Sequence, residues 1–192
     1  GPLLSNPKLM IFGAAAQFGI FFTLALASLL GYDIQKEQLR LNTEAFLAGK
    51  PANNVLLYGD AGTGKSSTVK AIVNEFHDRG LRLIEVKKNQ LYQIPDLMDS
   101  LAANPLKFII FIDDLSFASD DRDFTALKTV LEGSVAARSS NTVVYATSNR
   151  RHIVRETFSE RDGSEVHRND SMQEALSLSE RFGMKILFAR PN

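Results

Sequence analysis

The chain has 192 residues, which is enough for one domain of ordinary size and a short appendage but not for two full domains. Its 22 lysines and arginines balance 22 aspartates and glutamates, so no net charge draws the whole chain to nucleic acid or to an acidic membrane. Because these residues include no cysteine, disulfides, thiolate catalysis and cysteine-bound zinc are excluded, and 44% hydrophobic with 23% charged residues indicates a globular chain.

The first feature along the chain is an uncharged, strongly apolar run over residues 9–32, LMIFGAAAQFGIFFTLALASLLGY. At about 1.5 Å per residue, a helix of this length would cross a hydrocarbon core of about 30 Å. The run therefore predicts an apolar helix with the properties of a transmembrane segment. Two alternatives stay open. One is a secretory signal peptide, with Lys8 as its charged flank and a small-x-small cleavage pattern at residues 25–27, and the other is a buried helix of a soluble protein.

From Asp33 onward, segments with helical periodicity alternate with short apolar segments that are typical of strands. We expect helices over residues 35–47, 65–77, 94–102, 123–132 and 171–181, and strands over residues 55–58, 81–86, 108–112, 142–146 and 185–188. Residues 108–112, FIIFI, are apolar at every position, as in a central strand that is covered by helices on both sides. The alternation predicts an α/β fold in which a five-stranded parallel sheet lies between two layers of helices.

The strongest chemical signal follows the first predicted strand. Gly59-Asp60-Ala61-Gly62-Thr63-Gly64-Lys65-Ser66 matches the Walker A motif G-x-x-x-x-G-K-[ST], with a strand before it and a helix after it. The glycines let the backbone wrap around phosphate oxygens, and the helix start supplies N–H donors. We expect Lys65 to reach the β and γ phosphates of ATP, the Ser66 hydroxyl to bind Mg²⁺, and Ser67 to belong to the same nucleotide site.

Two aspartates come directly after the apolar strand at residues 108–112. This is the form of a Walker B strand, in which Asp113 holds the hydrated magnesium ion and Asp114 polarises the attacking water. The alternative is that the two carboxylates only cap the strand end and the next helix. Asp114 is one methylene shorter than the glutamate that is more usual at the second position, so hydrolysis is expected to be slower or the pocket tighter.

Two further residues gain meaning from their order along the chain. Asn149 follows the fourth predicted strand, where an amide beside Walker B can touch both the γ-phosphate and the lytic water, although an asparagine after a strand is often only a turn residue. Arg181 ends the helix before the fifth strand, where it can serve as an arginine finger toward a neighbouring subunit. The alternative for Arg181 is an arginine that stabilises a helix C-terminus, with Gly183 in the cap.

These motifs, in this order, resemble those of the AAA+ ATPases. More closely, residues 31–192 resemble a bacterial AAA-type ATP-binding family catalogued as a domain of unknown function, through FIIFIDDLSF, LKTVLEG, YATSNRRHIV and ERFGMKILF. The resemblance implies a P-loop NTPase core with Walker B, sensor and finger placed as above. It implies that Gly31 and Tyr32 lie near the adenine. It also implies a small helical lid with a second sensor arginine after the core, which is missing here, so we expect this chain to be a fragment.

The first residues resemble something else. GPLLSNPKLMIFGAAAQFGIFFTLALASLLGYD is similar to a membrane segment of the β subunit of sodium-pumping carboxylic acid decarboxylases such as the oxaloacetate enzyme. We therefore expect residues 1–31 to be an apolar segment, foreign or membrane-spanning, and residues 32–192 to be the AAA+ core. A fusion or chimera would then join near residues 31–33, and neither decarboxylation nor sodium transport follows from one helix.

The functional expectation is an ATP-binding, ATP-hydrolysing AAA+ module that uses ATP and Mg²⁺ and remodels an unknown macromolecule. It would form a homo-oligomeric ring through Arg181 and act in the cytoplasm, attached to the inner membrane if residues 9–32 are a genuine helix. A small-molecule P-loop kinase and a membrane-anchored nucleotide switch with little turnover are the alternatives. Residues 150–168 hold five arginines, but acidic residues interleave with them, so nucleic acid is only weakly indicated as a partner.

Overall fold

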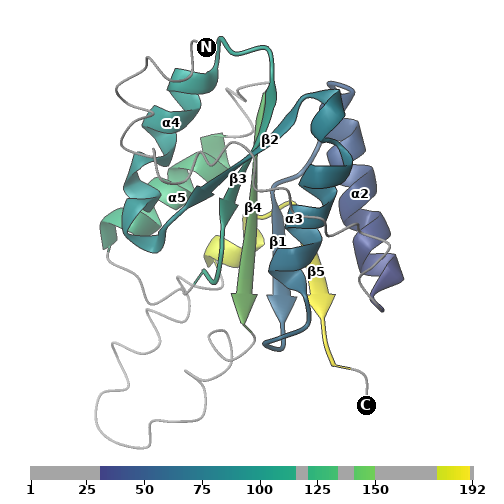
Figure 1. Ribbon diagram of the computed structural model, residues 1–192. Helices are drawn as coiled ribbons and strands as arrows, with labels where there is room; N and C mark the ends of the chain where they lie inside the picture. The colour runs from purple at the N-terminus through teal and green to yellow at the C-terminus, as the bar shows by residue number, and fades with distance from the viewer. Residues whose placement is uncertain (1–30, 116–120, 134–140, 150–176, 191–192) are drawn as a thin grey trace, which may run out of the picture.

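The computed structural model describes residues 31–115, 121–133, 141–149 and 177–190, which form an α/β fold around one sheet (Figure 1). The strands are β1 (Val55–Gly59), β2 (Leu81–Val86), β3 (Lys107–Ile112), β4 (Thr142–Asn149) and β5 (Met184–Phe188). They lie in the order β2-β3-β4-β1-β5, and each neighbouring pair is parallel. The carboxyl ends of all the strands therefore share one edge, toward the bottom of Figure 1.

Helices cover both faces of this sheet, as the alternation in the sequence predicted. Helices α2 (Asp33–Leu47) and α3 (Lys65–Glu75) lie on one face, and α4 (Ile94–Leu101) and α5 (Asp121–Gly133) lie on the other (Figure 1). Successive strand residues point to opposite faces, so Leu57 packs with α2 and α3 while Leu56 packs with α4 and α5. Two buried apolar clusters result, one on each side of the sheet, and the polar groups lie at its carboxyl edge.

Several boundaries differ from those expected. Strand β4 continues to Asn149 instead of ending at residue 146, because its last residues pair with β1 up to Gly59↔Asn149. Helix α3 ends at Glu75 and passes into the short 3-10 helix η2 (His77–Arg79). A second 3-10 helix, η3 (Lys88–Gln93), occupies a stretch for which the sequence analysis named no element.

Some expectations fall outside the described residues. Of the helix expected over residues 171–181, only residues 177–180 are described, and they are helical. The apolar run lies almost wholly within residues 1–30, and the five arginines lie within residues 150–168; neither range is described. Across the described ranges, no helix has both the length and the apolar character to cross a membrane.

Buried hydrogen bonds inside the core connect α2 to the sheet. The Tyr145 hydroxyl on β4 is fully buried, where it accepts a hydrogen bond from Asn42 Nδ2 at 3.0 Å and lies 2.8 Å from Thr43 Oγ1. Asn42 also closes onto the backbone of Asn53, just before β1, through its amide nitrogen and oxygen, both at 2.9 Å. Burial raises the pKa of Tyr145 to about 12, although the hydrogen bonds to Thr43 and Asn42 act in the opposite direction. The hydroxyl thus stays protonated and paired in the core.

Candidate nucleotide-binding site

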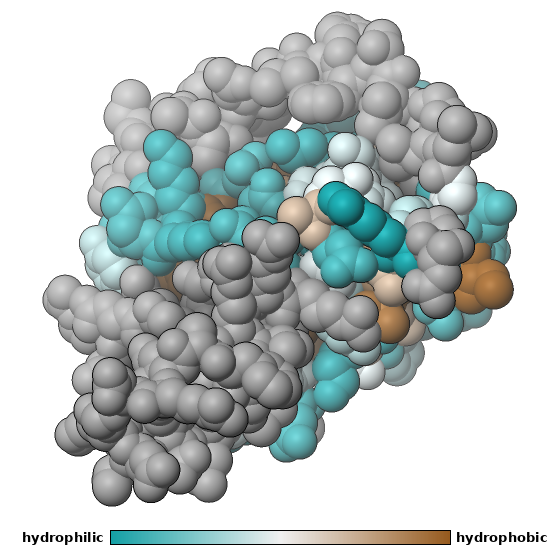
Figure 2. Space-filling view, turned by 90° about the horizontal axis from the view of Figure 1, so that it is seen from below, coloured by the Kyte–Doolittle hydropathy of each residue, from teal (hydrophilic) through white to brown (hydrophobic). Residues whose placement is uncertain are grey.

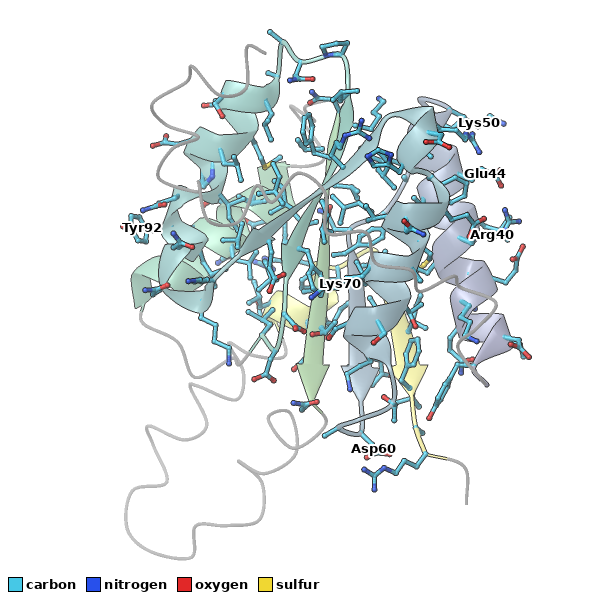
Figure 3. The ribbon with its side chains drawn as sticks, viewed as in Figure 1. Arg40, Glu44, Lys50, Asp60, Lys70 and Tyr92 are labelled. Atoms are coloured by element: carbon cyan, nitrogen blue, oxygen red, sulfur yellow. The ribbon has the colours of Figure 1, made fainter. Side chains whose placement is uncertain are left out.

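The Walker A residues form a loop between β1 and α3 at the carboxyl edge of the sheet. Figure 3 shows Asp60 at the lower end of β1, beside the end of β5. Gly59 has φ 139° and Gly64 has φ 84°, values that residues with a Cβ atom rarely adopt. Thr63 Oγ1 donates to the Asp60 carbonyl at 2.9 Å and closes the turn. Seen from below, the described surface at this edge is mainly hydrophilic (Figure 2), which suits a charged ligand.

Lys65 lies inside this loop with only 6% of its surface exposed. Its Nζ donates to the carbonyls of Gly59 and Asp60, at 3.2 and 2.6 Å, and to Asn149 Oδ1 at 3.3 Å. Burial lowers the pKa of the Lys65 amine, and the carboxylates at positions 60, 113 and 114 partly oppose that shift. A phosphate would supply the counter-charge that this buried ammonium draws only in part from neighbouring carbonyls and carboxylates.

The expected metal ligands lie in contact with each other. Ser66 Oγ donates to Asp113 Oδ1 at 2.6 Å, and Thr147 Oγ1 on β4 donates to the same oxygen at 2.6 Å. Within the described residues no group of three or more histidine, aspartate or glutamate side chains could hold a metal without other ligands. One hydroxyl and one carboxylate oxygen at the phosphate loop fit Mg²⁺, which binds through few carboxylates plus waters and substrate phosphates.

Asp114 is held in an unusual conformation beside this pair. Its φ of 53° lies in the left-handed region, and its backbone N–H donates to Thr147 Oγ1 at 2.8 Å. Its Oδ1 accepts from Asn149 Nδ2 at 2.8 Å, and its Oδ2 lies 3.1 Å from Lys88 Nζ, at the start of η3. Asn149 therefore connects Lys65 to Asp114, while its role as a sensor of the γ-phosphate and the attacking water stays a prediction.

Tyr32 comes just before α2 and packs against the end of β5. Its ring stacks on Phe188 with centroids 4.9 Å apart, and its hydroxyl donates to the Ala189 carbonyl at 2.8 Å. The next residue, Arg190, donates its backbone N–H to Asp60 Oδ2 at 2.9 Å. Tyr32 thus packs against the end of β5, and the neighbouring residue Arg190 contacts the phosphate loop. The resemblance implied that Gly31 and Tyr32 lie near the adenine, and this stays a prediction, as does the part of Ser67, which lies in the first turn of α3.

Arg181 lies apart from these residues. Its Nη2 is 2.6 Å from Glu132 Oε1 on α5, and its Nη1 donates to the carbonyl and hydroxyl of Ser177, both at 3.3 Å. The side chain is 24% exposed, and its Nε is buried without a hydrogen-bond partner among the described residues. These contacts link Arg181 to α5 and to its own helix, and its role as a finger stays a prediction.

The family model described as "Protein of unknown function (DUF815)" matches residues 19–192. The chain belongs to this family. The matched range includes the phosphate loop, Asp113 and Asp114, Asn149 and Arg181, and it begins inside the apolar run, ahead of the start expected near residue 31.

Three curated proteins are similar to parts of the DUF815 chain. The Replication factor C large subunit of Staphylothermus marinus is 32% identical over 116 residues, which are 55% of this chain and 26% of that protein. The ATP-dependent zinc metalloprotease YME1L of Drosophila melanogaster is 26% identical over 162 residues, 76% of this chain and 19% of that protein. Glutaconyl-CoA decarboxylase subunit beta of Acidaminococcus fermentans is 41% identical over 64 residues, 29% of this chain and 17% of that protein.

The chain thus spans about a quarter or less of the length of these curated relatives. The decarboxylase similarity covers so little of either protein that it gives only weak support to a fusion at the N-terminus, which stays a prediction. No decarboxylase activity follows from it.

Solved structures show the same fold at low identity. The Aeropyrum pernix ORC1 protein, solved with DNA, superposes with a TM-score of 0.56 at 14% identity over 83% of this chain and 45% of its own. AMPPCP-bound DnaA from Aquifex aeolicus gives 0.53 at 18% identity over 86% and 49%, and DnaI gives 0.52 at 18% over 88% and 89%. The DUF815 chain therefore has the α/β fold of AAA+ P-loop NTPases.

Three residues at this site of the DUF815 chain escaped the sequence analysis: Thr147, Lys88 and Arg190. Each is a polar or charged residue at or within two residues of the carboxyl end of a strand, namely β4, β2 and β5. In a parallel sheet these ends share one edge, so that position is the signal by which they could have been found. Thr147 was the hardest to recognise, because the strand was expected to end one residue before it.

Proposed function

We propose that this chain is an ATP-hydrolysing AAA+ module that couples ATP turnover to the remodelling of a macromolecule. The observation that carries the proposal is the continuous contact from Lys65 through Asn149 to Asp114. It joins a phosphate-binding amine to a carboxylate that can polarise water, at the same sheet edge as the Ser66 and Asp113 oxygens.

The chemistry follows from these contacts. On binding ATP, Lys65 exchanges its carbonyl partners for the β and γ phosphates, which neutralise its buried charge. Mg²⁺, held by Ser66 and Asp113, would neutralise charge on the same phosphates. Asp114 then accepts a hydrogen bond from the attacking water and takes its proton as the bond to the γ-phosphorus forms. The bond from that phosphorus to the bridging oxygen breaks in the same displacement, so ADP leaves and inorganic phosphate is released. Asn149, in contact with both Lys65 and Asp114, orients that water relative to the phosphate.

Phosphate release from the purified chain with ATP and Mg²⁺ tests the proposal. Lys65→Ala should lose most ATP affinity in calorimetry, whereas Asp114→Asn should keep ATP bound and stop turnover. Lys70→Ala is the matched control, because Lys70 lies on the same helix but its amine faces Glu85 at 3.6 Å (Figure 3). Parent-like ATP binding in Lys65→Ala would overturn the site, and parent-like turnover in Asp114→Asn would remove Asp114 from the mechanism.

The contact between Lys88 and Asp114 favours one of the alternatives, a nucleotide switch with little turnover. Both Asp114 oxygens accept hydrogen bonds, from Asn149 and from Lys88, so the carboxylate has less freedom to activate water. If this restraint limits the chain, Lys88→Ala should raise phosphate release severalfold at saturating ATP. An unchanged or lower rate in Lys88→Ala would reject the restraint. Transfer of phosphate to an added small-molecule acceptor, with no free phosphate, would instead indicate the kinase.

Arg181 is proposed as the finger that completes a neighbouring site in a homo-oligomeric ring. A planar cation at a developing phosphoryl charge is worth a rate factor on the order of 10³ to 10⁵. Arg181→Ala should therefore bind ATP normally and hydrolyse it slowly. Mixing it with Lys65→Ala chains should restore some activity, because the Lys65→Ala chain still offers its Arg181. A mixture no more active than the sum of its components would leave Arg181 as a helix-end residue paired with Glu132.

The macromolecule that is remodelled has to be found by experiment. Two neighbours bear on nucleic acid: the ORC1 structure contains DNA, and the Replication factor C subunit is named for replication. Phosphate release with and without single- and double-stranded DNA tests that partner class.

A cytoplasmic location with inner-membrane attachment through residues 9–32 is also proposed. Cell fractionation of the chain with and without residues 1–31 tests it, with membrane recovery expected only for the longer form.

A further inference from the structure

The segment that leaves β5 closes around the outside of the phosphate loop. The Asp60 N–H donates to the Phe188 carbonyl at 3.0 Å, the Arg190 N–H donates to Asp60 Oδ2 at 2.9 Å, and Arg190 Nη2 donates to the Ala61 carbonyl at 3.0 Å. Three hydrogen bonds thus join the first two variable positions of the Walker A loop to the last residue of β5 and to Arg190, two residues beyond it. Two of the three involve Arg190, which the Walker A pattern does not include.

The bond to Ala61 has a chemical consequence for the loop. The Ala61 carbonyl and the Gly62 N–H belong to one peptide unit, and the described residues contain no cis peptide bond, so the two groups point to opposite sides. A guanidinium on the carbonyl oxygen draws electron density from that unit and makes its N–H a stronger donor. A Cβ placed on Gly62 would lie 3.9 Å from Arg190 Nη2, so the guanidinium lies next to both residues of this peptide unit.

From these contacts we infer that Arg190 is a positioning residue for the phosphate loop, which fixes and polarises the Ala61–Gly62 peptide from behind. It increases affinity for the polyphosphate chain of the nucleotide without touching it. The inference rests on the proposed ATP site. Its class of ligand is a nucleoside di- or triphosphate, because the backbone N–H groups of the loop serve the β and γ phosphates. The affinity of nucleotides that lack those phosphates should not depend on Arg190.

A matched control exists on β2, the outer strand on the other side of the sheet from β5. Arg82 on β2 also donates from its guanidinium to backbone carbonyls, those of His77 and Leu81 at 2.9 and 2.7 Å, but it lies far from the phosphate loop in strand order. Arg82→Ala therefore removes the same kind of exposed contact without changing the loop. Arg190→Lys supplies a second comparison, because a lysine keeps the charge but not the planar fork.

The experiment is calorimetric titration of the full chain with ATP, ADP and AMP in the presence of Mg²⁺. Arg190→Ala should weaken ATP and ADP by about 3- to 10-fold and leave AMP unchanged, Arg190→Lys should fall between, and Arg82→Ala should match the parent. Equal weakening of all three nucleotides, or ATP and ADP affinities equal to those of Arg82→Ala, would overturn the inference. Lys65→Ala in the same series separates the two failures: ATP binding that survives that substitution overturns the proposed site itself.

Discussion

Thr147 offers the sharpest test of how the aspartates are held, because one buried hydroxyl contacts both of them. Its Oγ1 donates to Asp113 Oδ1 at 2.6 Å and accepts the Asp114 N–H at 2.8 Å, and the residue is only 2% exposed. Thr147→Val keeps the shape and the strand preference of the side chain while removing both hydrogen bonds. Ser66 still donates to Asp113 in that variant, so the metal position keeps one of its two supports.

The size of the effect follows from those two bonds. A hydrogen bond to a charged acceptor is worth about 1.5 to 3 kcal/mol, and an N–H left unpaired in a buried site costs about 1 to 3 kcal/mol. The two losses share one hydroxyl, so we expect Thr147→Val to lower the free energy of unfolding by about 2 to 4 kcal/mol in total. Because the N–H bond helps to hold Asp114 at φ 53°, turnover should fall further than ATP affinity.

Urea unfolding without nucleotide measures the first effect, and phosphate release at saturating ATP, per folded chain, measures the second. Ser148→Ala is the control: its hydroxyl is also buried and donates to the Leu115 carbonyl at 2.8 Å, but it contacts neither aspartate. That variant should lose about 1 kcal/mol and keep its turnover. The reasoning is refuted if Thr147→Val is no less stable than Ser148→Ala, or if it hydrolyses ATP at the parent rate.

Two further predictions concern stability alone. Because burial holds the pKa of Tyr145 at about 12, against about 10 when unfolded, the native chain keeps a proton that the unfolded chain releases between those values. The contribution of Tyr145 to the free energy of unfolding is therefore fully present below about pH 10, and about 3 kcal/mol of it is lost as the pH rises toward 12. In urea unfolding across that range, Tyr145→Phe should not show this loss. Tyr92→Phe, which changes an exposed tyrosine, should still show it. Gly59→Ala should be the more damaging of two loop substitutions in thermal melts, because its Cβ would overlap the Phe188 carbonyl, whereas Gly64→Ala meets open space and adds only backbone strain of about 1 to 2 kcal/mol; equal melting losses would contradict this.

The sequence by itself determined the local chemistry. Residues 59–66 are contiguous, so their spacing alone specifies a strand, a glycine-rich turn and a helix start, and it predicts that Lys65 binds phosphate and Ser66 binds Mg²⁺. The apolar run before Asp113 likewise predicted a central strand, because five apolar residues in a row that end at two aspartates are typical of a short strand covered on both faces. Strand and helix alternation was enough to predict a parallel sheet between helices.

Tertiary structure decided which distant residues meet at that site. Arg190 contacts Asp60, 130 residues away in the sequence, and Asn149 contacts Lys65, 84 residues away. Helical and strand periodicity carries no information over such separations. The end of β4 shows the reason. Thr147 and Ser148 are polar yet 2% and 0% exposed, so hydropathy ended the predicted strand too early, while pairing with β1 extended it. Local pattern fixes local backbone, but the register and order of strands arise from packing of the whole sheet, and these bring Thr147, Lys88 and Arg190 to one edge.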